Sequence, residues 1–421
     1  MSSWSKVWSN IWTDYSYQIG VASLLVTTLC AARYVRRNVS MGDLEATLAT
    51  LNNSINNTIT DYTPVFGGVE EKSQLLDGIE IQVMGRSYVL PDDVAMFERD
   101  VESFLWFSYR RNFRAIGGTT YTSDRGWGCM LRCIQMLYSH TLIRHSFSRD
   151  WRWTKCPVYN SILRDFLDDP NGLYSIQQIA KAGCSAGKDV GTWFGPNTAA
   201  QSIRILTEFH KELNLTVQVV MDNFLCIEDI KFFAKEDDVT WTPLLLIIPL
   251  RLGLSECNNI YIDNIKHCFK IEQSVGAVGG RPNSAFYFVG YQKDKLLYLD
   301  PHVTQESLCP DDIDLDNIPD DTYHTKKVDL LAWDQLDPSI AVAFYCKTEH
   351  SFDDLCQQFR ETITAGSGSL FEMVAKRPAY MTPPRRTPVD KLLENYSAEY
   401  DEVNTEDAAS DSDGFEIISN S

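Results

Sequence analysis

Three short apolar runs in the second half of the chain constrain its fold more than any other feature. They cover residues 244–249, 285–291 and 296–299. Successive positions in each run are apolar, so a strand formed from it would bury both of its faces. The turn sequence at 290–295 predicts that the last two runs pair as an antiparallel hairpin. Helical and strand patterns are mixed along the chain without strict alternation, which predicts the α+β class.

A helix is predicted to begin at Cys129. Met130, Cys133, Ile134 and Leu137 recur at helical spacing, and Gly128 stands directly before the cysteine. The free N–H groups and the dipole at a helix N-terminus favour a thiolate there. We expect Cys133 to pack inside the helix as a small hydrophobic residue.

Asp300-Pro301-His302 follows the last of the three apolar runs. Positions i and i+2 of an extended backbone point the same way, so the carboxylate and the imidazole should emerge side by side. Pro301 stiffens this presentation, and an aspartate beside a histidine orients it for general-base work. The alternatives are that His302 caps a turn and Cys129 is a structural thiol. The two features together favour a cysteine nucleophile with a histidine base.

Composition limits the other possibilities. The 421 residues are 44% hydrophobic and 12% aromatic, which suits a folded enzyme with a large core. The net charge of −19 argues against nonspecific binding to nucleic acid. The eleven cysteines are an odd number and form no CxxC pair, which removes the common zinc-site spacings. We therefore expect a reducing, cytoplasmic location. Catalysis by a thiolate and a histidine would need neither a metal nor an organic cofactor.

The chain is expected to have three parts, at residues 1–75, 76–375 and 376–421. The first contains an uncharged run at 19–32 followed by three arginines, and is expected to be partly disordered. This run is short for a membrane span, so an interfacial or docked helix is favoured over an anchor. The last part joins a linker rich in proline and arginine to an acidic tail that we expect to be disordered. Residues 392–421 carry nine acidic side chains and no basic one.

Several longer segments resemble the autophagin family, the autophagy-related cysteine proteases that process ubiquitin-like modifiers. The resemblance extends from about residue 97 to residue 359. The matching segments, in chain order, are 104–113, 115–118, 122–132, 195–198, 248–254, 279–284, 298–302 and 336–339.

The resemblance implies a papain-like fold with an additional small subdomain, inserted in the 76–375 catalytic domain. It implies that Cys129 is the nucleophile, His302 its base and Asp300 the partner that orients the base. Tyr109 would stabilise the oxyanion together with the backbone N–H of Cys129. The alternative for Tyr109 is a core aromatic in an aromatic-rich helix.

Two further segments match segments that, in the family, control entry of the substrate into the active-site groove. Trp193 matches a tryptophan that covers the active-site groove, and Pro282 lies in a segment that resembles a substrate-admitting flap, residues 281–284. A narrow groove would reject any side chain at the cleavage site and accept glycine. The plain alternative for Trp193 is a packed surface tryptophan.

The acidic tail ends in a candidate short linear motif. Phe415 and Ile418 follow Asp411 and Asp413, and this pattern resembles motifs that bind autophagy modifiers by adding a strand to their sheet. Residues 371–374 fit the same loose pattern without acids directly before them.

The resemblance implies a protease that trims a ubiquitin-like autophagy modifier after a glycine and releases that modifier from phosphatidylethanolamine. Its partners would be the precursor and the lipid-conjugated modifier, with possible peripheral membrane contact, and it would act as a monomer without nucleic acid. The alternatives are an isopeptidase for another ubiquitin-like modifier and a catalytically weak scaffold that only binds the modifier.

Overall fold

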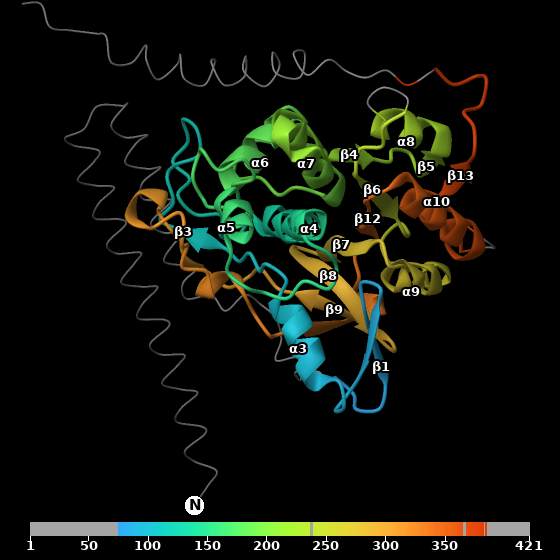
Figure 1. The fold of residues 1–421 in the computed structure, drawn as a ribbon, viewed down its shortest axis with the longest axis horizontal. Helices are drawn as coiled ribbons and strands as arrows, with labels where there is room; N and C mark the ends of the chain where they lie inside the picture. Colours follow the sequence, from blue (N-terminus) through green and yellow to red (C-terminus); the bar gives the residue numbers. More distant parts are fainter. Residues whose placement is uncertain (1–74, 236–238, 365–367, 383, 385–421) are drawn as a thin grey trace, which may run out of the picture. The chain divides into compact units, whose positions relative to one another are not determined.

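A mixed sheet runs through the middle of the protein in the computed structural model (Figure 1). The structure describes residues 75–235, 239–364, 368–382 and 384. The uncharged run at 19–32 and the tail residues Phe415 and Ile418 lie outside the described residues. The strands of this sheet are β1 (Glu80–Val83), β2 (Arg86–Val89), β4 (Thr216–Val219), β6 (Leu244–Arg251), β7 (Ser274–Arg281), β8 (Ser284–Gln292), β9 (Lys295–Leu299), β11 (Asp329–Ala332) and β12 (Ser339–Cys346).

The strand order is β11-β9-β8-β7-β12-β6-β4, and β1 pairs with β8 and with β2. All of these pairs are antiparallel except β4 with β6. The predicted hairpin is confirmed: β8 and β9 pair from Gln292 with Lys295 onward, and only Lys293 and Asp294 lie between these two residues. The first apolar run is also confirmed as a strand, because it forms most of β6.

Helices cover both faces of the sheet, which explains why its central strands β6, β8 and β12 are largely apolar. In β12, Ala341 and Ala343 face one core, while Val342 and Phe344 face the other. The first core contains residues of α4 (Cys129–Ser146), α5 (Pro157–Arg164), α6 (Ile176–Cys184) and α7 (Pro196–Phe209). The second contains residues of α8 (Ile227–Ala234), α9 (Ile262–Lys270) and α10 (Glu349–Gln358). The described part of the chain is thus of the predicted α+β class.

Smaller elements complete the described structure. Helix α3 (Val94–Glu102) packs beside β2, and β3 (Arg110–Arg111) pairs in parallel with β10 (Gln305–Glu306). Single helical turns are η1 (Lys211–Leu213), η2 (Asn259–Tyr261), η3 (Pro310–Asp312), η4 (Asp321–Tyr323) and η5 (Trp333–Gln335), and a π-helical turn, η6 (Phe359–Ile363), follows α10.

The internal segment that fits the modifier-binding pattern is part of the folded structure. Its strand β13 (Glu372–Val374) pairs in parallel with β5 (Phe224–Cys226). The ring of Phe371 is buried and lies 5.2 Å from that of Phe359. A linear motif must offer its aromatic side chain to a partner, so this segment cannot act as one while folded.

No helix in the part of the chain that the structure describes is long and apolar enough to cross a membrane. The ten cysteines within the described residues are all free thiols.

Candidate active site

Cys129 is the first residue of α4, as predicted, and its side chain is almost completely buried. Gly128 precedes it because a Cβ at this position would lie 2.6 Å from the side chain of Asp124. Burial alone would raise the pKa of the Cys129 thiol, but the neighbouring His302 outweighs this effect and lowers the pKa. The backbone N–H of Ala285 and the hydroxyl of Tyr109 also favour the thiolate.

His302 and Asp300 stand side by side directly after β9, as the sequence predicted. Nδ1 of His302 lies 2.5 Å from Oδ1 of Asp300, and the same oxygen accepts the backbone N–H of His302 at 3.0 Å. Burial would lower the pKa of His302, but Asp300 and the Cys129 thiolate raise the pKa to about 9. Burial likewise raises the pKa of Asp300, and His302 more than offsets this and lowers the pKa. These opposite charges stabilise each other in a poorly solvated site.

The second ring nitrogen of His302, Nε2, is buried and has no conventional hydrogen-bond partner among the described residues. It is the nitrogen left to act on Cys129, because Nδ1 is occupied by Asp300. The imidazole ring is held by edge-to-face contacts with Tyr109 at 5.4 Å and Phe286 at 5.6 Å between ring centroids. The orientation of the histidine ring is therefore fixed by contacts with three residues, Asp300, Tyr109 and Phe286.

Tyr109 does not lie in a helix, contrary to the alternative considered for it. Helix α3 ends at Glu102, and the aromatic segment after it, residues 104–109, forms neither helix nor strand and is mostly buried. The backbone N–H of Tyr109 donates to the carbonyl oxygen of Pro301 at 2.9 Å, which ties this segment to the histidine. Burial and then the negative charge of Cys129 raise the pKa of Tyr109, so its hydroxyl is a hydrogen-bond donor at neutral pH.

Trp106 is a site residue that the sequence analysis did not single out. Its indole Nε1 donates to the backbone carbonyl oxygen of Asp300 at 2.8 Å. The resemblance covered this tryptophan only as part of an aromatic run, and no local signal distinguished it from a core residue. The contact fixes the backbone that presents the carboxylate.

Trp193 and Pro282 are both exposed, and both lie in loops. Trp193 is 46% exposed, in the loop between α6 and α7. Gly191 of that loop (φ +85°) approaches so closely that a Cβ there would lie 2.3 Å from the Tyr121 ring, which contacts Trp127. Pro282 lies in the two-residue turn between β7 and β8. The first loop thus approaches Tyr121, and the second lies three residues before Ala285, whose backbone N–H favours the Cys129 thiolate.

A buried ion-pair cluster joins the first turn of α4 to two neighbouring segments of the chain, and the sequence did not predict it. Nε of Arg132 lies 2.7 Å from Asp124, and Nη1 of Arg132 lies 2.8 Å from Asp168. All three side chains are buried. Burial disfavours the charge of Arg132, but the two carboxylates outweigh it and raise the pKa of this arginine. The only available signal was the presence of both Asp124 and Arg132 in the 122–132 segment.

A buried thiol beside an imidazole that a carboxylate orients is the arrangement of a cysteine hydrolase. Within the described residues, no group of three or more histidine, cysteine, aspartate or glutamate side chains could hold a metal ion.

Comparison with known proteins places this hydrolase in a family. Residues 94–358 match the peptidase C54 catalytic domain. The chain is 42% identical over 330 residues to "Cysteine protease ATG4B" of Xenopus laevis, covering 72% of this chain and 85% of that protein. It is 38% identical over 359 residues to "Cysteine protease ATG4A" of Homo sapiens, covering 77% of this chain and 87% of that protein. The chain belongs to the peptidase C54 family, the autophagins, and is a cysteine protease of autophagy.

Proposed function

We propose that this protease cleaves a ubiquitin-like autophagy modifier on the carboxyl side of a glycine, in the precursor and in the form conjugated to phosphatidylethanolamine. The observation that carries the proposal is the buried Cys129 thiol beside His302, which in turn is 2.5 Å from Asp300. Family membership supports the class of substrate.

In the proposed mechanism, the Cys129 thiolate attacks the glycine carbonyl and forms a tetrahedral oxyanion. The Tyr109 hydroxyl and the backbone N–H of Cys129 donate to this oxygen. His302, protonated through its raised pKa, gives its proton to the leaving amine, and a thioester remains. Water then attacks the thioester while His302 takes up its proton, which restores the thiolate and releases the modifier with a free glycine carboxylate.

Selectivity for glycine is proposed to be steric. Trp193 would narrow the groove above the nucleophile, and the turn that contains Pro282 would move to admit the substrate tail. The exposure of both residues in loops, one of which approaches Tyr121 while the other lies three residues before Ala285, supports these roles. We further propose a papain-like fold with a small additional subdomain, a monomer and a cytoplasmic location.

The test uses a purified modifier precursor with residues beyond the glycine. Cys129→Ala should abolish release of the extension and leave modifier binding intact, and Cys309→Ala serves as a partly buried control thiol outside the site. Cleavage by Cys129→Ala at the wild-type rate would refute the nucleophile assignment. Preference for a precursor of another ubiquitin-like modifier would favour an isopeptidase, and binding without turnover by the wild type would favour a scaffold.

The two terminal segments are proposed to have different binding roles. We propose that Phe415 and Ile418 bind the modifier, because two acidic residues precede them in a strongly acidic tail. Replacing both by alanine should weaken modifier binding by the full chain and leave cleavage at saturating substrate unchanged. We propose that the 19–32 run makes peripheral membrane contact, and equal sedimentation with vesicles after deletion of residues 1–40 would contradict this.

A further inference from the structure

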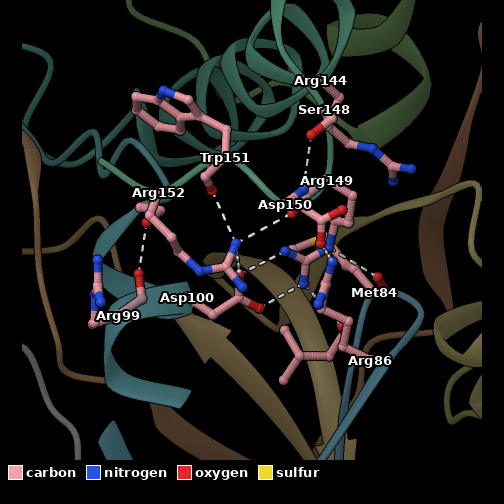
Figure 2. A network of polar contacts seen from close by, with 12 residues as sticks. Met84, Arg86, Arg99, Asp100, Arg144, Ser148, Arg149, Asp150, Trp151 and Arg152 are labelled. Carbon is pink, nitrogen blue, oxygen red and sulfur yellow. Dashed lines mark hydrogen bonds and ion pairs between the residues drawn. The ribbon is translucent and has the colours of Figure 1, made fainter. Parts of the chain in front are cut away.

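Five arginines come together where the end of α4 meets α3 and the β1–β2 hairpin (Figure 2). This accumulation runs against the protein's overall charge of −19. Within the part of the chain that the structure describes, Asp100 and Asp150 are the only carboxylates bonded to arginines of the group, and Glu272 and Lys347 line a neighbouring hollow with Arg144 and Arg149. The arginines are Arg86 of β2, Arg99 of α3, Arg144 of α4, and Arg149 and Arg152 of the following loop.

Two of these arginines hold the scaffold in place. Arg149 donates to both carboxylate oxygens of the buried Asp100, at 2.5 and 2.6 Å, and to two carbonyl oxygens of β1 and the turn after it. Arg144 donates to the carbonyl oxygens of Ser274 and Glu272. Burial, and then the charge of Arg149, lower the pKa of Arg144 to about 10, so it remains charged at neutral pH. Both contribute positive potential, while most of their N–H groups are already bonded within the protein.

The other three arginines line a hollow of about 400 Å³ that also has Ser87, Met96 and Asp150 in its wall. The Arg99 side chain is exposed and has no ion pair with any described residue. The Arg86 Nε is buried and has no hydrogen-bond partner among the described residues. Arg152 reaches the deeper Asp100 at 3.2 Å and keeps part of its surface open. Asp150 is the one carboxylate in the wall, so positive charge is in excess.

We propose that this hollow binds a phosphomonoester, either free as an inositol phosphate or carried on a phosphoinositide headgroup. Guanidinium groups offer the paired donors that phosphate oxygens accept, and a dianion would offset the excess positive charge. The volume lies at the small end of ligand pockets, which suits a phosphorylated ring rather than an extended chain. The Met96 side chain, 58% exposed at the rim, provides an apolar neighbour for a headgroup at a lipid surface.

Asp150 forms an ion pair with Arg86 in this structure, and its side chain is largely exposed. A phosphate in the hollow would compete with this carboxylate for Arg86. Removing the charge with Asp150→Asn should therefore tighten binding, whereas a purely structural role of the pair would predict no gain. The arginine variants should thus lower the affinity for phosphate, and the aspartate variant should raise it.

The site is independent of the proposed catalytic function. Helix α4 has 18 residues, which at about 1.5 Å each separates its two ends by roughly 27 Å. Cys129 is at one end and Arg144 is near the other. The Arg99→Gln variant of the protease should therefore cleave a soluble modifier precursor at the wild-type rate.

The test measures binding of inositol hexakisphosphate to the full chain by calorimetry, and sedimentation with phosphatidylcholine vesicles with and without a phosphatidylinositol monophosphate. Arg99→Gln and Arg86→Gln should each weaken binding about tenfold, Asp150→Asn should tighten it, and Arg164→Gln, an exposed arginine of α5, should leave it unchanged. Binding of the soluble probe alone would identify a free phosphate ligand, and binding to doped vesicles a lipid headgroup. Absence of binding to both, or equal weakening by Arg164→Gln, would overturn the proposal.

Discussion

Asp124 and Arg132 form a buried ion pair, 2.7 Å between Nε and the carboxylate, and the Asp124 side chain packs against Gly128, the residue before Cys129. The other carboxylate oxygen of Asp124 accepts the backbone N–H of Arg110, and its backbone carbonyl accepts the N–H groups of Trp127 and Gly128. One aspartate thus fixes the loop, the start of α4 and the segment that carries Tyr109. We interpret Asp124 as a positioning residue for the site.

Asp124→Asn should lower the free energy of unfolding by about 3–5 kcal/mol, because it leaves Arg132 with half of its buried charge compensation. It should also lower kcat more than it raises KM, and shift the alkylation profile of Cys129, because the helix start moves. Denaturant unfolding and steady-state kinetics would measure both effects. Glu306→Gln, which removes an exposed partner of Arg111 nearby, is the control and should change neither. An Asp124→Asn protein of normal kcat would show that the cluster is only structural.

The thiol and imidazole should titrate as an ion pair. Cys129 is ionised above its lowered pKa, and His302 stays protonated up to about pH 9, so both charges coexist between these limits. Iodoacetamide should therefore label Cys129 rapidly at neutral pH, where an ordinary thiol with a pKa of about 8.5 is mostly protonated. Proteolysis should fall as the pH rises through about 9, because His302 loses the proton needed by the leaving amine.

His302→Asn provides the matching variant for this measurement. Without the imidazolium, burial dominates, and the labelling profile of Cys129 should move to or above that of an ordinary thiol. Mass spectrometry of the Cys129 peptide follows this site separately from the other thiols. A wild-type profile with its midpoint at or above pH 8.5 would contradict the ion pair.

Tyr109→Phe should lower kcat by about a hundredfold to a thousandfold with little change in KM, because it removes the proposed donor to the oxyanion and keeps the ring contact with His302. Stability should stay close to the wild type, since no packing is lost. Tyr291→Phe, in the core on the other face of the sheet, is the control. If both variants turned over at the wild-type rate, Tyr109 would be a core aromatic and nothing more.

Trp193→Ala should relax selectivity at the cleavage site. If the indole narrows the groove, its removal should raise the cleavage of a precursor with alanine in place of the scissile glycine by about tenfold or more, relative to the glycine substrate. Competition between the two precursors gives the ratio of kcat/KM directly. Tyr380→Ala, which removes an exposed aromatic elsewhere, should leave the ratio unchanged. Equal changes for both precursors would indicate a packed surface tryptophan without a selective role.

Local patterns in the sequence were sufficient for the main elements of the site. The apolar runs predicted β6, β8 and β9, because a strand buried on both faces must be apolar at every position. Helical spacing after Gly128 placed Cys129 at a helix start, and the i, i+2 relation placed Asp300 beside His302. Each of these inferences depends only on residues a few positions apart.

Contacts between distant segments were decided by the tertiary structure. Strand β7 is rich in glycine and carries little strand propensity, yet it pairs with β8 and β12, where a Cβ on Gly280 would lie 1.9 Å from a carbonyl oxygen of β8. Other contacts also join segments that are far apart in the chain. Trp106 bonds to Asp300, Arg132 pairs with two buried carboxylates, and Arg149 pairs with Asp100. The physical reason is that a side chain's charge, donors and size are set by the sequence, whereas its partners depend on which strands and helices pack together.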